Sequence, residues 1–314
     1  MGSLYVKLLG ACHQALCAVF AALGSVGRGP TRAGTGQRDS WKGWDALELS
    51  GRSPATTRER LLFPEHSVDV VGEYSAAVVP WPMKAAAVQA MLPRELELGP
   101  QSLTPSGQHP VLWVFGRQRS VRPNFLKVRG MRYSEFIVAI PYVQWVSTVN
   151  AYRGPFTFLP RLYLDHPFPV ILGILFGLAK RWCRFRQDDH SDDLSSLFGI
   201  SSIVRGRFTP HGPVLTPTQF PLFAGMRPAF EQPLIDKPVL GPLLGAYFDW
   251  ELDRAWMQAL DAEVEIQQAF LPGLAKEGYE VKGIDQVPLG AFCFLVPWTV
   301  TLPFLPSALR TQVV

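Results

Sequence analysis

The feature that most constrains the fold of this chain is its content of proline and glycine. The 314 residues include 28 prolines and 27 glycines. Proline removes a backbone donor and breaks helices, and glycine favours turns, so we expect few long helices and many short strands. The length suffices for one large domain or two small ones with a substantial core.

Composition and charge describe a globular chain that is slightly apolar and poor in charge. Hydrophobic residues make up 47% and charged residues 18%, with a formal net charge of +4. A nucleic-acid-binding protein would show a basic stripe interleaved with aromatic residues. The nearest candidate, Arg117 to Arg132, is better explained by solvated loops or strand edges, so no nucleic-acid partner is expected. The four cysteines are scattered without CxxC spacing, which predicts free thiols and no zinc site.

The first 38 residues differ from the rest of the chain. They contain Lys7, Arg28, Arg32 and Arg38 but no acidic residue, and the stretch 8–26 is apolar with interruptions. This is typical of a targeting segment, either an organellar transit peptide or a signal peptide. A membrane anchor ranks last, because a span needs about 20 cleaner apolar residues; a disordered extension is the other alternative. We expect 1–38 to be a targeting segment, 39–60 a linker and 61–314 the folded domain of an organellar or cytoplasmic protein.

Hydrophobic patterning along the folded part predicts many strands and three helices. Strands are predicted at 68–74, 76–80, 111–115, 133–142, 156–164, 200–208, 263–267 and 289–302. Helices are predicted at 82–92, 167–179 and 246–260, and a polar loop at 187–193. This pattern favours a strand-dominated barrel or sandwich.

Most catalytic motifs are missing from the sequence, which leaves Lys180 and Glu135 as the candidates. There is no glycine-rich phosphate loop, no Gly-x-Ser-x-Gly elbow and no HExxH ligand pair. The acidic run 188–193 could bind a hard cation, although such loops are usually only solvated. Lys180 follows the uncharged stretch 170–179 and precedes Arg181.

A lysine amine acts as a nucleophile only when it is neutral. At its ordinary pKa only roughly 0.04% is neutral at pH 7. Burial, or repulsion by the cation of Arg181, would lower the pKa of Lys180 and raise that fraction. The alternative is a structural helix end, where two cations are favoured by the helix dipole. Composition alone favours this alternative.

Three segments follow one another in a recognisable order. The helix-and-turn segment VQAMLPRELEL (88–98) comes first, the strand YSEFIVAIPY (133–142) second, and LYLDHPFPVILGILFGLAKRW (162–182) third. Their order and the "YLD…G…G-x-x-K" spacing resemble the acetoacetate decarboxylase superfamily over roughly 68–182. The resemblance implies an α+β fold: a strand-rich acetoacetate decarboxylase-like barrel with a few flanking helices. It also implies a homo-oligomer, and no cofactor or metal is expected.

The resemblance also implies roles for individual residues. Lys180 aligns with the Schiff-base lysine of the superfamily, and Arg181 with the second lysine whose charge activates the first. Glu135 aligns with an active-site carboxylate that orients the amine or moves a proton.

The sequence departs from the superfamily pattern at several positions. The region 73–77 lacks an arginine expected to bind the substrate carboxylate, and the strand 111–118 lacks a second catalytic glutamate. Gly173 is followed by Ile-Leu instead of Arg-Glu, and Ala179 replaces a proline. These departures argue against acetoacetate itself and favour a larger, more apolar carbonyl substrate.

Three functional hypotheses follow. The first is a lyase that acts on a carbonyl or keto-acid substrate through an imine on Lys180, by decarboxylation or aldol-type chemistry. The alternative is a non-catalytic barrel that binds an apolar metabolite, with Lys180 in a structural role. The third is membrane association through residues 1–38, although a membrane partner ranks last.

Overall fold

The computed structural model describes residues 61–62, 68–124, 130–147, 152–175, 178–188, 191–195, 202–220, 223–238, 242–266, 279–282, 290–306 and 309–311. The predicted targeting segment and linker lie outside these residues. Within them, no helix combines the length and apolar character needed to cross a membrane.

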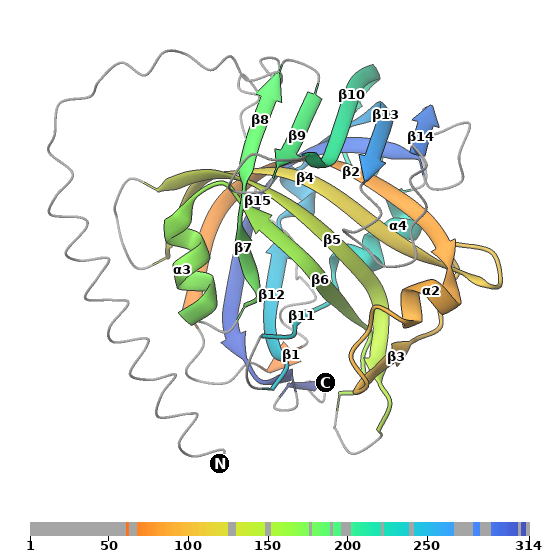
Figure 1. The fold of residues 1–314 in the computed structure, drawn as a ribbon, viewed down its shortest axis with the longest axis vertical. Coiled ribbons are helices and arrows are strands. Elements are labelled where there is room, and N and C mark those ends of the chain that lie inside the picture. The colour runs from red at the N-terminus through yellow and green to blue at the C-terminus, as the bar shows by residue number, and fades with distance from the viewer. Residues whose placement is uncertain are drawn as a thin grey trace, which may run out of the picture.

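The described part of the chain is mostly strand (Figure 1). The strands are β1 (Leu61–Leu62), β2 (Val68–Lys84), β3 (Leu96–Leu98), β4 (Gln108–Pro123), β5 (Met131–Trp145), β6 (Phe156–Leu164), β7 (Lys180–Trp182), β8 (Arg184–Asp188), β9 (Ser191–Ser195), β10 (Ser202–Leu215), β11 (Leu234–Asp236), β12 (Leu244–Trp250), β13 (Trp256–Ile266), β14 (Tyr279–Lys282), β15 (Ala291–Phe304) and β16 (Arg310–Thr311). The helices are α2 (Ala85–Gln89), α3 (Pro167–Leu175), α4 (Phe223–Phe230) and the short 3-10 helix η2 (Leu252–Arg254). The predicted strand-rich α+β class is confirmed.

Within the described residues, fourteen of these strands form one sheet, and part of that sheet returns upon itself. The order β12-β11-β6-β5-β4-β2-β15 is joined at its ends by a pairing of β12 with β15. All pairings in this ring are antiparallel except the parallel pairing of β11 with β6. β7 adds a second parallel pairing further along β6, on the edge opposite β5. The ring encloses the space that holds the candidate site.

The central strands are buried on both faces, which explains their continuous apolar stretches. In β4 the ten residues from His109 to Gln118 are all buried. Because alternate residues face opposite sides, Trp113 and Phe115 join one hydrophobic cluster while Leu112 and Val114 join the other. Helix α4 packs its own aromatic residues against Phe292 and Phe294 of β15.

Several predicted elements are wrong in type or in extent. The predicted helix 82–92 contains only the five residues of α2, because β2 stays paired with β4 as far as Lys84. The predicted helix 246–260 is instead β12, η2 and the start of β13, since these strands pair with β11, β15 and β10. Much of the predicted loop 187–193 belongs to the hairpin of β8 and β9. Tertiary pairing therefore overrides local helix preference.

One close approach in the ring depends on the absence of a side chain. Gly116 of β4 lies opposite Glu135 of β5, and a Cβ atom on Gly116 would overlap the ring of Tyr74. Tyr74 is 2% exposed, so its ring has no room to move away.

We expect Gly116→Ala to lower the free energy of unfolding by about 1–3 kcal/mol through overpacking against Tyr74. Urea denaturation measures the change. Gly225→Ala is the matched control, because its Cβ would meet only Leu103 Cδ2 at 3.7 Å, an ordinary contact. Equal stability of the two variants would contradict this account.

Candidate active site

Strand β5 carries Glu135 into the enclosed space. Tyr133, Glu135 and Ile137 alternate along the strand and line a single pocket, while Phe136 points into the opposite core. Glu135 lies between Gly116 of β4 and Leu164 of β6 in the sheet register, and it is only 5% exposed.

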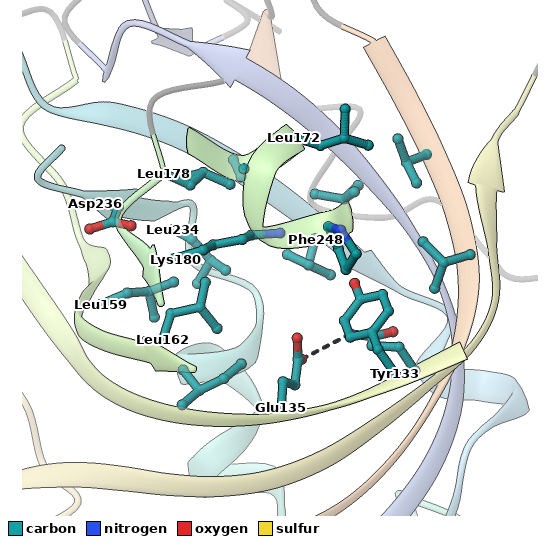
Figure 2. A pocket seen from close by; sticks show the side chains of 18 of the residues that line it. Tyr133, Glu135, Leu159, Leu162, Leu172, Leu178, Lys180, Leu234, Asp236 and Phe248 are labelled. Carbon is teal, nitrogen blue, oxygen red and sulfur yellow. Dashed lines mark hydrogen bonds between the residues drawn. The ribbon is translucent and has the colours of Figure 1, made fainter. Parts of the chain in front are cut away.

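Lys180 reaches the same pocket from a strand and not from the end of a helix. Helix α3 ends at Leu175, four residues before the end of the predicted helix. The Leu178 amide then donates to the Gly173 carbonyl (2.7 Å), and Lys180 opens β7 in parallel register with Leu162 of β6. The amine and the carboxylate therefore converge, as Figure 2 shows.

The pocket is small and mostly apolar. Its volume is about 120 Å³. Aliphatic and aromatic side chains form most of its wall, among them Val121, Met131, Ile137, Leu159, Leu172 and Phe248. The polar groups that face it come from five strands: Gln118, Arg122, Tyr133, Glu135, Lys180, Asp236 and Trp298.

Burial dominates the protonation of both candidate residues. Desolvation lowers the pKa of the Lys180 amine from its ordinary value, and the charges of Glu135 and Asp236 partly oppose that shift. Desolvation likewise raises the pKa of Glu135, against the charge of Lys180 and hydrogen bonding by Gln118 and Tyr74. Each group is thereby shifted toward its neutral form.

Arg181 lies on the other side of β7 and does not line the pocket. Its side chain is exposed, Nη1 donates to the Tyr163 hydroxyl at 3.4 Å, and the guanidinium lies 5.8 Å from the centroid of the Tyr163 ring. The charges that act on Lys180 are those of Glu135 and Asp236. Of the two causes expected from the sequence, burial and the cation of Arg181, burial is the one that lowers the pKa of Lys180.

Asp236 is a site residue that the sequence analysis missed. It is 2% exposed on β11, and its Oδ2 accepts the Ala179 amide at 2.7 Å, one residue before Lys180. Burial raises the pKa of Asp236 to about 6, opposed by backbone hydrogen bonds and by the charges of Lys180 and Arg181. The short segment around it carries no motif, so only the β11–β6 pairing reveals its place.

Gln118 and Arg122 were also missed. Both lie on β4 beyond the end of the strand predicted at 111–115, and Gln118 is the last residue of the segment 111–118 in which a second glutamate was sought. Gln118 donates to Glu135 Oε1 at 2.9 Å. Arg122 is among the residues that line the pocket, on a strand where the resemblance placed no arginine.

Gly173 makes room for the stem of Lys180. A Cβ atom on this α3 residue would overlap Cγ, Cδ and Cε of Lys180.

The described residues contain no group of three or more His, Cys, Asp or Glu side chains placed to hold a metal ion. A neutral amine beside a carboxylate in an apolar pocket is able to attack a carbonyl carbon and exchange protons.

Gly173→Ala should lower the free energy of unfolding by about 1–3 kcal/mol, because the methyl group collides with Lys180. Lys180→Ala removes the colliding atoms, so adding Gly173→Ala to that variant should cost much less. Urea denaturation of the four proteins of this cycle measures the coupling. Purely additive effects would show that the two residues do not compete for the same space.

The pH dependence of stability should report Asp236. Its pKa is raised to about 6 from an ordinary value of 3.8, so the folded protein binds this proton more tightly than the unfolded chain. The protonated Asp236 therefore adds up to about 3 kcal/mol to the free energy of unfolding. This stabilisation is complete below about pH 4 and is lost as the pH rises through about 6. Asp236→Asn should weaken the dependence of the unfolding free energy on pH over this range. An unchanged slope would contradict the raised pKa of Asp236.

Comparison with known proteins finds similarity in structure only. No protein-family model and no curated protein matches this sequence. The enduracididine biosynthesis enzyme MppR with HEPES bound matches with 12% identity over 76% of this chain and 87% of that chain, with a TM-score of 0.49. An acetoacetate decarboxylase from Legionella pneumophila matches with 13% identity over 84% and 98%, TM-score 0.48. An acetoacetate decarboxylase-like enzyme from Sphingomonas wittichii matches with 14% identity over 76% and 94%, TM-score 0.46.

These matches, at 12–14% identity and with TM-scores below 0.5, assign no chemistry to this chain. Two of the three are named as an acetoacetate decarboxylase or an acetoacetate decarboxylase-like enzyme, the group that the motifs of the sequence resemble.

Proposed function

We propose that this protein is a Schiff-base lyase that acts on a carbonyl or keto-acid substrate through Lys180. The observation that carries the proposal is the convergence of the Lys180 amine and the Glu135 carboxyl, from strands far apart in sequence, in one apolar pocket. Such a pocket favours the neutral form of the amine, which imine formation requires.

The chemistry would proceed in balanced steps. The neutral Lys180 amine attacks the carbonyl carbon, and loss of water gives a protonated imine. The electrons of the bond between the α carbon and the β carbon then move into this iminium and leave an enamine. A β carboxylate leaves as carbon dioxide, or a β carbon that bears a hydroxyl gives up the hydroxyl proton and leaves as an aldehyde. A proton added at carbon gives a new imine, and water hydrolyses it to return the amine.

Three residues would assist these steps. Glu135, held near the amine and with a raised pKa, would take and return protons. Arg122 would bind the carboxylate of a keto acid, since a guanidinium matches that group in charge and shape. Asp236 would hold the backbone before Lys180 through the Ala179 amide.

The apolar wall of the pocket favours a second candidate, a non-catalytic site for an apolar small molecule. In that case Lys180 would be an ion partner of Glu135 and Asp236, with no covalent role. Both candidates place the ligand in the same pocket, so the covalent step discriminates between them.

Borohydride trapping tests the lyase proposal. With pyruvate, acetoacetate, benzoylacetate and acetophenone, we expect a reduced adduct on the Lys180 peptide by mass spectrometry. Lys180→Met keeps the stem length without the amine and should give no adduct, whereas Arg181→Gln should still react. No adduct with any of these carbonyl compounds, at neutral or alkaline pH, would exclude the covalent mechanism.

The same variant tests the binding candidate. If the pocket only binds, Lys180→Met should keep its calorimetric affinity for acetophenone and the unmodified protein should trap nothing. If the protein is a lyase, Lys180→Met should lose all adduct whether or not it still binds acetophenone.

A further inference from the structure

Gln118 lies between an indole and the candidate catalytic carboxylate. Its Oε1 accepts a hydrogen bond from Trp298 Nε1 at 2.9 Å, and its Nε2 donates to Glu135 Oε1 at 2.9 Å. The three residues come from β4, β15 and β5, and all are at most 5% exposed. These three hydrogen-bonded side chains are therefore almost inaccessible to bulk water.

Because Trp298 can only donate a hydrogen bond and the Glu135 carboxylate can only accept one, the Gln118 amide has a single possible orientation. An indole N–H donates and never accepts, so Trp298 must face the carbonyl oxygen of Gln118. The amide NH₂ then has to face Glu135. Rotating the amide by half a turn would set NH₂ against N–H and oxygen against carboxylate, losing both bonds.

We propose that Gln118, locked by Trp298, is a positioning residue that favours the ionised form of Glu135 and directs its second oxygen toward the Lys180 amine. This inference rests on the proposed function for its catalytic meaning. In physical terms, the hydrogen bonds from Trp298 to Gln118 and from Gln118 to Glu135 influence the protonation of the Lys180 amine. The carboxylate oxygen that does not bind Gln118 points into the pocket (Figure 2).

The groups around Glu135 decide whether its pKa rises or falls when the Gln118 hydrogen bond is lost. Lys180, Tyr74, Tyr133 and Asp165 face Glu135, and the hydrogen bond from Gln118 lowers its pKa against desolvation. The Tyr74 hydroxyl also lowers it, although no described residue gives that hydroxyl a hydrogen bond of standard geometry. Desolvation already outweighs these groups, so loss of the Gln118 bond should raise the pKa of Glu135 further and shift it toward the protonated form.

Loss of the Glu135 charge would in turn change Lys180. The charges of Glu135 and Asp236 raise the pKa of the amine against burial, and Arg122 lines the same pocket from β4. When Glu135 becomes neutral, only Asp236 still raises that pKa. The pKa of Lys180 should therefore fall further below its ordinary value.

The pH dependence of Lys180 acylation tests the coupling. Acetylation by p-nitrophenyl acetate, followed at the Lys180 peptide by mass spectrometry, reports the neutral amine and needs no imine. Gln118→Leu and Trp298→Phe should each move the midpoint down by about one pH unit. Trp113→Phe is the matched control, because its indole is fully buried and its N–H has no hydrogen-bond partner among the described residues.

A double-variant cycle separates positioning from a general structural effect. Glu135→Gln should lower the midpoint by itself, and adding Gln118→Leu to it should produce no further shift. A shift of the same size in both backgrounds, or an unmoved midpoint in a folded Gln118→Leu or Trp298→Phe protein, would overturn the inference. Gln118→Leu and Trp298→Phe change different strands, so the inference can still be tested with one variant if the other does not fold.

The outcome is independent of the lyase proposal. Midpoint shifts without borohydride adducts would support the coupling and reject the lyase. Adducts without midpoint shifts would support the lyase and reject the coupling.

Discussion

The register of strand β6 is the constraint on which the site depends. Leu164 of β6 lies opposite Glu135 of β5, and Leu162 of the same strand lies opposite Lys180 of β7. One strand therefore sets the separation of the amine and the carboxylate. Since a slip by one residue turns every side chain to the other face, this register also decides that Lys180 enters the pocket and Arg181 leaves it.

Desolvation then converts this geometry into reactivity. The pocket places apolar side chains around both the amine and the carboxyl, and desolvation moves the pKa of each toward the neutral form while their charges oppose the shift. An exposed cation such as Arg181 is screened by water and contributes less than the loss of hydration. The apolar wall is therefore part of the chemistry as well as of the core.

Several elements could be predicted from the sequence because their local and tertiary preferences agree. The strand at 156–164 matches β6, and the strand at 133–142 lies within β5. The failures occur where tertiary pairing decides: the helix predicted at 246–260 forms strands because β11, β15 and β10 lie beside it. For the site, Lys180 and Glu135 carried visible signals, whereas Gln118 and Asp236 acquire their meaning from hydrogen bonds across strands.

By itself, the sequence determined the strand-rich class, the order of the principal strands and the candidate pair Lys180 and Glu135. The strand-rich class and the strand order follow from prolines, glycines and alternating apolar residues, which act locally along the chain. The candidate pair follows from the resemblance of three segments to the acetoacetate decarboxylase superfamily. Only the tertiary structure decided which groups surround the amine, that Asp236 is one of them, and that Gln118 holds the carboxylate. Electrostatic shifts depend on distance and hydration in space, and neither quantity is encoded by spacing along the chain.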